Sequence, residues 1–193
     1  MPYKRKRKTT RKKIIKKAKY AVSRAPDLNL MRSNSASTHL RTVNNVTVSF
    51  DNHTDRVKAL IDEAAVVKGC LCWLTSKTLI DALARCKGVS LVISRGRMAR
   101  AMKERYKALK TVSARGAVRV LGAEGKHNSL LHHKFAIGYN NSGKALWLCT
   151  GSFNWSKKAS GNLENLMIFR DAGVIAAFEQ EFILLLSKSK AFV

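Results

Sequence analysis

Short apolar runs alternate with helical patterns through the middle of the chain. Val46–Phe50 alternates apolar and polar side chains as a half-buried strand does, and Cys70–Leu74 and Val89–Ile93 are apolar runs of strand length. The composition of Cys70–Leu74, which includes Trp73, predicts a buried strand. Thr54 with Asp55 is expected to cap a helix to about Val67, and Thr75–Ser76 is expected to cap a second helix over Leu79–Cys86, because apolar residues recur at helical spacing in both stretches. Strands that alternate with helices at such short spacings predict an α/β fold, with a mixed, largely parallel sheet flanked by helices.

The second half of the chain adds further elements to this sheet. Leu130–Ile137 and Ala145–Thr150 are two apolar runs joined by a polar turn, which predicts an antiparallel strand pair. A helix over about 98–109 and a strand over 116–121 are expected before this pair. A final helix is expected to begin at Asp171, and its wide apolar face is suited to cover the sheet.

A histidine and a lysine lie two residues apart in the first strand of this pair. Because side chains alternate along a strand, His132 and Lys134 are predicted to share one face, while His133 points to the other. The return strand delivers Ser152 and Asn154 close to them. An imidazole, an ammonium group, a hydroxyl and an amide are therefore expected to meet at one edge of the sheet.

These groups suit the cleavage of a phosphodiester. The imidazole of His132 can attack phosphorus. Lys134, Ser152 and Asn154 can donate hydrogen bonds to the non-bridging oxygens as negative charge builds up in the transition state. Glu164, further along the chain, can hold the other ring nitrogen of His132 and fix its tautomer. None of these roles requires a metal ion or a cofactor, so we expect neither.

Three separated blocks carry a resemblance to a known family. They are H-x-K at His132–Lys134, G-S-x-N at Gly151–Asn154 and N-x-E-N at Asn162–Asn165. The pattern resembles the signature of the phospholipase D superfamily, and within it the small members with a single motif, of the bacterial endonuclease and mitochondrial phosphodiesterase types. The resemblance extends over about residues 46–187. The sequence departs from the family's motif at Tyr139, where the motif has an aspartate five residues after the lysine.

The resemblance implies a two-step reaction in a dimer. After His132 has attacked phosphorus, a second group must protonate the leaving oxygen and later activate water. The superfamily uses two H-x-K motifs for this purpose, and His39, His53 and His127 belong to no second motif. The resemblance therefore implies a homodimer in which His132 of the partner subunit completes one shared site. In the family the motif aspartate, here Tyr139, supports the site rather than attacking phosphate.

The net charge restricts the partners of the chain. Its 193 residues contain 37 Lys and Arg against 12 Asp and Glu, which gives a formal net charge of +25. A surplus of this size indicates a polyanionic partner, and nucleic acid is the first candidate. Such binding should weaken steeply with salt. It should show little sequence preference, since no aromatic array for reading bases is evident.

Much of this charge lies at the amino terminus. We expect residues 1–44 to form a basic arm and linker, and residues 45–193 to form the phospholipase D-like catalytic domain. Eleven cations and no acid occur up to residue 20, a charge density that opposes independent folding. The cations predicted to bind nucleic acid in this arm are Lys4, Arg5, Lys6, Arg7, Lys8, Arg11, Lys12 and Lys13. In a eukaryotic host, Lys4–Lys8 would also fit a nuclear localisation signal.

A second group of cations follows the third predicted strand. Ten Lys and Arg against two Glu lie between residues 95 and 126. Arg95, Arg97 and Arg100 are nearest to the loop after the strand, and we expect them to contact the backbone of the substrate. The alternative is that this zone is simply the solvated face of a helix.

Cysteine usage and hydropathy indicate where the chain works. The cysteines are Cys70, Cys72, Cys86 and Cys149. The first two alternate with apolar residues as small buried side chains do, which favours a reducing compartment. With no apolar leader and no run long enough to span a bilayer, we expect an intracellular protein without stable membrane insertion. A metal site at the C-x-C pair, or at His127, His132 and His133, is an alternative that the spacing disfavours.

Three functions stay open at this point. The leading one is a metal-independent endonuclease that acts on DNA or RNA through a phosphohistidine. The second is a nucleic-acid-binding protein with a vestigial site, which predicts binding without cleavage and would account for Tyr139. The third is a hydrolase of a cardiolipin-type phospholipid, because such a lipid is also a polyanion. No amphipathic membrane anchor supports this third function.

Overall fold

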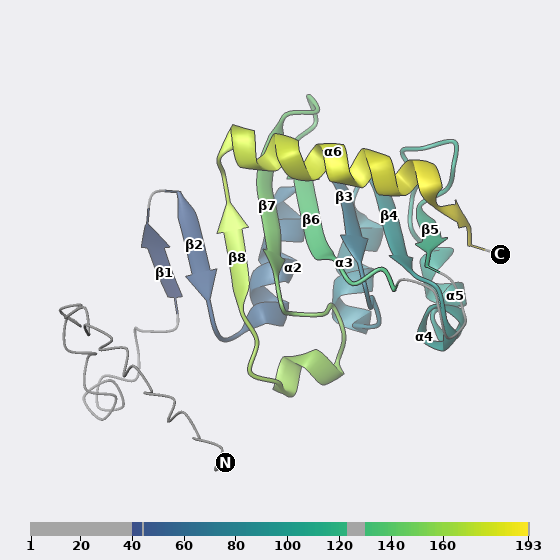
Figure 1. Cartoon of the computed structure of the whole chain (residues 1–193), viewed down its shortest axis with the longest axis horizontal. Coiled ribbons are helices and arrows are strands. Elements are labelled where there is room, and N and C mark those ends of the chain that lie inside the picture. Colours follow the sequence, from purple (N-terminus) through teal and green to yellow (C-terminus); the bar gives the residue numbers. More distant parts are fainter. Residues whose placement is uncertain (1–39, 44, 123–129, 193) are drawn as a thin grey trace, which may run out of the picture. The chain divides into compact units, whose positions relative to one another are not determined.

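One mixed sheet forms the centre of the fold (Figure 1). The computed structural model of the chain describes residues 40–43, 45–122 and 130–192. Within these ranges the strand order is β1-β2-β8-β7-β6-β3-β4-β5-β9. The strands are β1 (Leu40–Val43), β2 (Val46–Ser49), β3 (Val66–Leu71), β4 (Gly88–Ser94), β5 (Val118–Leu121), β6 (Lys134–Tyr139), β7 (Ala145–Gly151), β8 (Leu166–Phe169) and β9 (Lys190–Ala191). The helices are α2 (His53–Glu63), α3 (Lys77–Arg85), α4 (Arg97–Ala101), α5 (Lys103–Tyr106), the 3-10 helix η1 (Lys158–Gly161) and α6 (Ala172–Lys188).

The predicted α/β fold with a mixed sheet is confirmed, but its parallel part is small. β4 pairs in parallel with β3 and with β5. The other neighbouring strands pair antiparallel. The parallel part is thus confined to three strands, less than the largely parallel sheet that we expected. The reason lies in the connections: helices join β3 to β4 and β4 to β5, whereas a short turn joins β6 to β7 and so forces an antiparallel pair.

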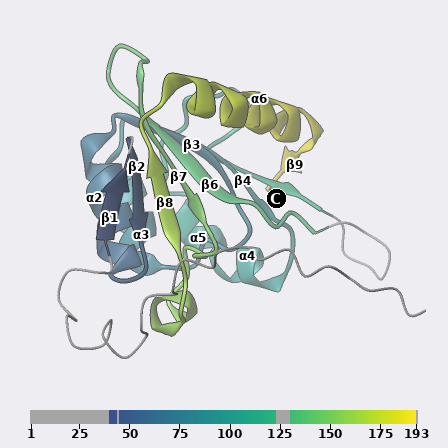
Figure 2. The ribbon, with the colours of Figure 1, turned by 60° about the vertical axis from the view of Figure 1, so that its left-hand side comes forward.

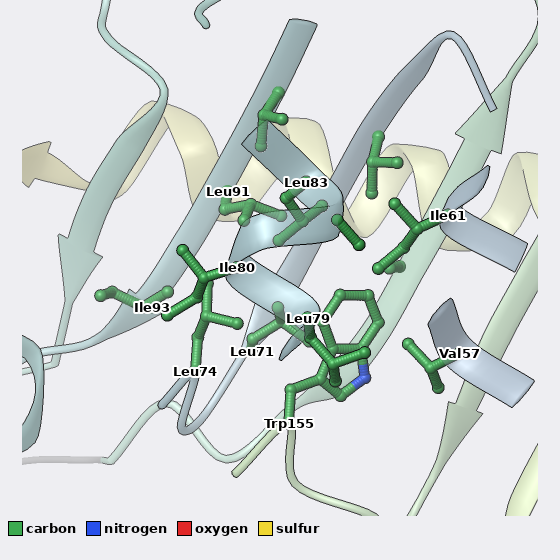
Figure 3. Close-up of a cluster of buried hydrophobic side chains, with 14 of the residues drawn as sticks. Val57, Ile61, Leu71, Leu74, Leu79, Ile80, Leu83, Leu91, Ile93 and Trp155 are labelled. Carbon is green, nitrogen blue, oxygen red and sulfur yellow. The ribbon is translucent and has the colours of Figure 1, made fainter. Parts of the chain in front are cut away.

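Helices cover both faces of the sheet (Figure 2). α2 and α3 lie on one face and α6 lies on the other. Along β6 the side chains alternate between the two layers: Phe135 and Ile137 belong to the buried cluster under α6, and Ala136 belongs to the cluster under α2 and α3. Trp155 lies among the aliphatic side chains of this second cluster (Figure 3). The turn that precedes Trp155 is therefore anchored in the core.

Two predicted helix starts are confirmed, and one is wrong. The Ser76 hydroxyl accepts a hydrogen bond from the Leu79 amide at 3.4 Å, and the Asp171 carboxylate accepts one from the Val174 amide at 2.8 Å. The first helix does not begin at Thr54 but follows Asn52, whose φ of 49° is left-handed. Asparagine tolerates this conformation better than most residues do.

Several element boundaries differ from those expected. The strand predicted over Cys70–Leu74 is β3, which begins four residues earlier and ends three residues earlier. The first helix therefore ends at Glu63 rather than near Val67, because β3 begins at Val66. The predicted helix over 98–109 is divided into α4 and α5. β1 pairs with β2, so the sheet reaches into residues that we expected to be linker.

Candidate active site

The motif blocks emerge at one edge of the sheet, the lower one in Figure 1. β6 begins at this edge, β7 ends at it and β8 begins at it, because both strand pairs are antiparallel. In the register, Phe135 faces Thr150 and Gly151 faces Leu166. The residues next to these strand ends, His132, Ser152 and Glu164, therefore lie along the same edge. We call it the motif edge.

His132 and Lys134 are in direct contact at the motif edge. The ammonium nitrogen of Lys134 lies 3.2 Å from Nδ1 and 3.3 Å from Nε2 of His132. It also donates to the backbone oxygen of His132 at 2.9 Å. His133 turns the other way, and its Nε2 lies 3.3 Å from a carboxylate oxygen of Glu181 on α6. Of the two adjacent histidines, His132 thus contacts Lys134 with its exposed imidazole, and His133 does not.

The G-S-x-N and N-x-E-N blocks are bonded to each other. The Ser152 amide donates to Oδ1 of Asn165 at 3.2 Å, and the Asn165 amide donates to Oγ of Ser152 at 3.0 Å. The Ser152 hydroxyl donates in turn to the carboxylate of Glu164. These reciprocal bonds fix the serine next to the glutamate. The role of Asn165 was not foreseen, although N-x-E-N contains it.

The glutamate does not contact the histidine as we expected. Its two carboxylate oxygens accept from the hydroxyl of Ser152 and, at 3.1 Å, from the side-chain amide of Asn162. The ring of His132 is engaged by Lys134 instead. The structure thus divides the predicted residues into a His132–Lys134 pair and a Ser152–Glu164 pair on neighbouring strands.

Asn154 lies in a turn that is tied to the start of α3. The backbone oxygen of the next residue, Trp155, accepts hydrogen bonds from the amides of Thr75 at 2.8 Å and Ser76 at 2.9 Å. The side-chain oxygen of Asn154 is buried, and no described residue donates to it. A buried acceptor without a donor is costly.

Tyr139 lies at the opposite end of β6 from the motif edge. Five residue steps of about 3.3 Å separate it from Lys134, about 16 Å in all. Its hydroxyl donates to Glu179 on α6 at 2.6 Å, and Lys68 lies over its ring. Burial and then the Glu179 carboxylate raise the pKa of Tyr139, so the phenol stays neutral. Tyrosine at the aspartate position therefore removes no group from the surroundings of His132.

Comparison with protein families shows to which family the chain belongs. The family model described as "Cardiolipin synthase, PLD-like domain" matches residues 34–186. The chain belongs to the phospholipase D superfamily. It is 23% identical to the uncharacterized protein L381 of Acanthamoeba polyphaga mimivirus, over 86% of this chain and 74% of that protein. It is 31% identical to the mitochondrial cardiolipin hydrolase of Xenopus tropicalis, over 50% of this chain and 45% of that protein.

Solved structures of phospholipase D-like proteins share the fold. NucT from Helicobacter pylori superposes with a TM-score of 0.61 and 18% identity, over 76% of this chain and 98% of that one. Nuc from Salmonella typhimurium, a phospholipase D family member, gives 0.59 and 21%, over 76% and 97%. The chain thus contains a whole domain of this kind.

A cavity of about 740 Å³ adjoins His132 in this phospholipase D-like domain. Its lining is aliphatic with a cationic rim. The lining residues are Arg95, Val120, Leu121, Gly122, Leu130, Leu131, His132, His133, Leu185, Lys188 and Lys190. Arg95 follows β4 directly, and its amide donates to the backbone oxygen of Leu121 at 3.0 Å. Arg95, one of the cations predicted to bind substrate, therefore lines the same cavity as His132.

The other predicted cations are placed less closely or not described. Arg97 begins α4 and Arg100 lies within it, both exposed. The arm residues from Lys4 to Lys13 lie outside the described residues, as do His39 and His127. The basic arm and the metal alternative that includes His127 are therefore still predictions.

The cysteines and the possible metal ligands of the described residues form no cross-link or cluster. The four cysteines are buried and free of disulfides, and burial raises the pKa of Cys149 to about 12. Among the described residues, no three His, Cys, Asp or Glu side chains are grouped so that they could hold a metal ion. Within the same residues, no helix has the length and the hydropathy needed to cross a bilayer.

Proposed function

We propose that this phospholipase D-like chain is a metal-independent phosphodiesterase that cleaves nucleic acid, most simply as an endonuclease. The observation that carries the proposal is the contact between the exposed His132 imidazole and the Lys134 ammonium. A ring nitrogen of histidine can attack phosphorus, and both ring nitrogens of His132 lie next to the Lys134 ammonium. Lys134 is then in place to receive the negative charge of the transition state.

The first step forms a covalent intermediate. A nitrogen of His132 attacks phosphorus, the P–N bond forms, and the bond to one ester oxygen breaks. The leaving oxygen needs a proton, and in the proposed homodimer His132 of the partner subunit supplies it. Lys134 and Asn154 are proposed to bind the non-bridging oxygens. Ser152 is proposed to act with Glu164, whose carboxylate it already contacts.

The second step frees the enzyme. His132 of the partner subunit, now neutral, takes a proton from water, and the resulting hydroxide attacks phosphorus. The P–N bond then breaks and restores His132. Two copies of the chain therefore share one site, and each motif edge contributes one histidine.

The charge of the chain supports nucleic acid as the substrate. A formal net charge of +25 provides many phosphate contacts, and Arg95 lines the cavity beside His132. The basic arm, from Lys4 to Lys13, is proposed to add affinity without sequence preference. Binding should therefore fall steeply as salt rises from 50 to 200 mM, typically by orders of magnitude.

A phospholipid hydrolase is the second candidate. The cavity beside His132 is lined by leucines and rimmed by Lys188 and Lys190, which suits an acyl chain below an anionic head group. The relative from Xenopus tropicalis carries the name cardiolipin hydrolase. We place this function second because the chain has far more cations than one lipid head group can bind, whereas a polynucleotide can bind many of them.

Cleavage in excess EDTA tests these functions. Plasmid, single-stranded DNA, RNA and cardiolipin-containing vesicles are each incubated with the wild-type chain and with His132→Asn. Loss of nucleic-acid cleavage in the variant, at unchanged circular dichroism, supports the endonuclease. Cleavage of the lipid alone supports the hydrolase. Gel shifts without cleavage by either protein would support the nucleic-acid-binding alternative with a vestigial site.

A further inference from the structure

One of the three tryptophans reaches solvent. Trp147 and Trp155 are 0% and 1% exposed and belong to the buried core. Trp73 is 40% exposed, although we expected it to lie inside a buried strand. β3 ends two residues before it, at Leu71. The indole ring is large and mainly apolar, so packing in the core does not explain why Trp73 is exposed to water.

Trp73 is held between the H-x-K and the G-S-x-N blocks. On one side of it, the amide of Cys72 donates to the backbone oxygen of His133 at 2.7 Å. On the other side, Leu74 forms a bridge with Trp155. The exposed indole therefore belongs to a segment that is bonded to the H-x-K block at one end and bridged at the other end to the residue after the G-S-x-N block.

The end of the strand pairing brings Trp73 and His132 to the same edge. In the antiparallel pair of β3 and β6, Leu71 is opposite Lys134, and the next hydrogen bond joins Cys72 to His133. Trp73 and His132 are each one residue beyond this last bond, where β3 has ended, so both lie at the motif edge. Both side chains are exposed.

Cations lie on both sides of this tryptophan along the motif edge. Lys134 lies on β6, on one side of β3, and Arg95 follows β4, on the other side. Neighbouring strands are about 4.8 Å apart. An aromatic surface between two cations is the arrangement with which proteins bind single-stranded nucleic acid, stacking the bases and neutralising the phosphates.

We propose that Trp73 stacks an unpaired base of the substrate while the adjoining phosphate lies at His132. This inference rests on the proposed function and narrows its substrate to single-stranded nucleic acid. Bases inside a duplex are already stacked on each other, so they cannot lie on the indole without being unpaired. Stacking does not distinguish the bases, which agrees with the expected lack of sequence preference.

Tryptophan fluorescence tests this proposal directly. Because Trp147 and Trp155 are buried, quenching by a ligand at the motif edge reports on Trp73. The full chain carrying His132→Asn is titrated in EDTA with three probes of equal charge: oligothymidine, an abasic oligomer and a hairpin duplex. We expect oligothymidine to quench the emission and the other two to leave it nearly unchanged. Equal quenching by oligothymidine and the abasic oligomer would overturn the proposal.

Substitutions of Trp73 provide the matched control. Trp73→Ala should weaken oligothymidine binding about tenfold, while binding of the abasic oligomer should change little. Trp73→Phe keeps an aromatic face and should retain most of the affinity. If Trp73→Ala bound both oligomers as tightly as the parent does, the indole would have no part in recognition.

The main competing explanation is that a second copy of the chain covers Trp73. In that case Trp73→Ala would shift the sedimentation coefficient toward that of the monomer, and acrylamide would quench the parent's emission poorly. Either result contradicts the stacking role. The proposed function can be contradicted independently of the stacking site. If the chain cleaves no substrate but shows base-dependent quenching, the stacking proposal stands and the endonuclease proposal is wrong.

Discussion

The hydroxyl of Tyr139 donates a 2.6 Å hydrogen bond to the carboxylate of Glu179, which joins β6 to α6. Lys68 on β3 lies 4.0 Å from the same carboxylate and 4.4 Å from the centre of the tyrosine ring. The family's motif has an aspartate at the position of Tyr139. In this chain α6 supplies the carboxylate, and β6 supplies the donor.

We predict that Tyr139→Phe destabilises the fold by about 1 kcal/mol, the usual net loss for one hydrogen bond. Nuclease activity per folded molecule should not change, because Tyr139 lies about 16 Å along β6 from Lys134. Urea unfolding and cleavage at matched folded concentration measure the two effects. A large loss of activity would mean that the Tyr139–Glu179 bond shapes the site after all.

Replacing Tyr139 with the aspartate of the family motif should destabilise the fold. Tyr139→Asp leaves a cavity where a nearly buried ring was and sets a second carboxylate beside Glu179. We expect a loss of about 3 kcal/mol or more in the free energy of unfolding. A more stable or more active variant would contradict our account of this position.

The two adjacent histidines offer a matched pair of variants. His132→Asn should abolish cleavage, and Lys134→Met should slow it about 100- to 1000-fold, as the loss of a donor to the transition state does. His133→Asn changes the same chemical group one residue away, but its side chain faces Glu181 on α6. It should therefore cleave at nearly the wild-type rate. Equal losses in the two histidine variants would argue against a role specific to His132.

Gly151 is predicted to control the geometry of the serine. Its φ of 151° disfavours a side chain, and an added Cβ would lie 2.3 Å from the backbone oxygen of Asn165. Gly151→Ala should therefore disturb the bonds between Ser152 and Asn165 and reduce the cleavage rate. Gly143→Ala is the control, since its φ of 81° also imposes strain but no atom lies within 4 Å of the new Cβ. It should lower stability, by about 1 kcal/mol, without slowing cleavage.

Asp62 should contribute a small, pH-dependent stabilisation. Its hydrogen bonds from Lys58, at 2.6 Å, and from Arg85, at 2.8 Å, lower the pKa of the carboxylate. A lowered pKa in the folded state adds stability above the unfolded value and loses it as the pH falls through the folded one. Because Asp62 is 40% exposed, Asp62→Asn should cost less than about 1 kcal/mol at pH 7. The difference between variant and wild type should narrow as the pH falls below about 4.

Much of the site could be predicted because it depends on local rules. The alternation of a strand placed His132 and His133 on opposite sides, and short-range capping placed Ser76 and Asp171 at helix starts. The partner of Glu164 could not be predicted in this way. Ser152 and His132 are both good partners for a carboxylate, and the choice depends on how two turns from distant parts of the chain meet.

Strand ends were the other source of error. Trp73 follows the alternation of the apolar run Cys70–Leu74, so the pattern alone indicated a buried side chain. β3 ends at Leu71, however, so Trp73 lies two residues beyond the strand and is exposed. Periodicity describes which side of a strand a residue faces, but it contains no information on where neighbouring strands stop supporting it.

β6 occupies the middle position of the nine-strand order, with four strands on either side in the described chain. His132 and Lys134 are therefore attached to the part of the sheet whose amides should exchange with solvent most slowly. Within one subunit we therefore expect the site to have no opening transition separate from that of the domain. At protein concentrations that keep the proposed homodimer associated, heat should abolish its chemistry only when the whole domain melts, so an activity curve and a calorimetric curve should coincide.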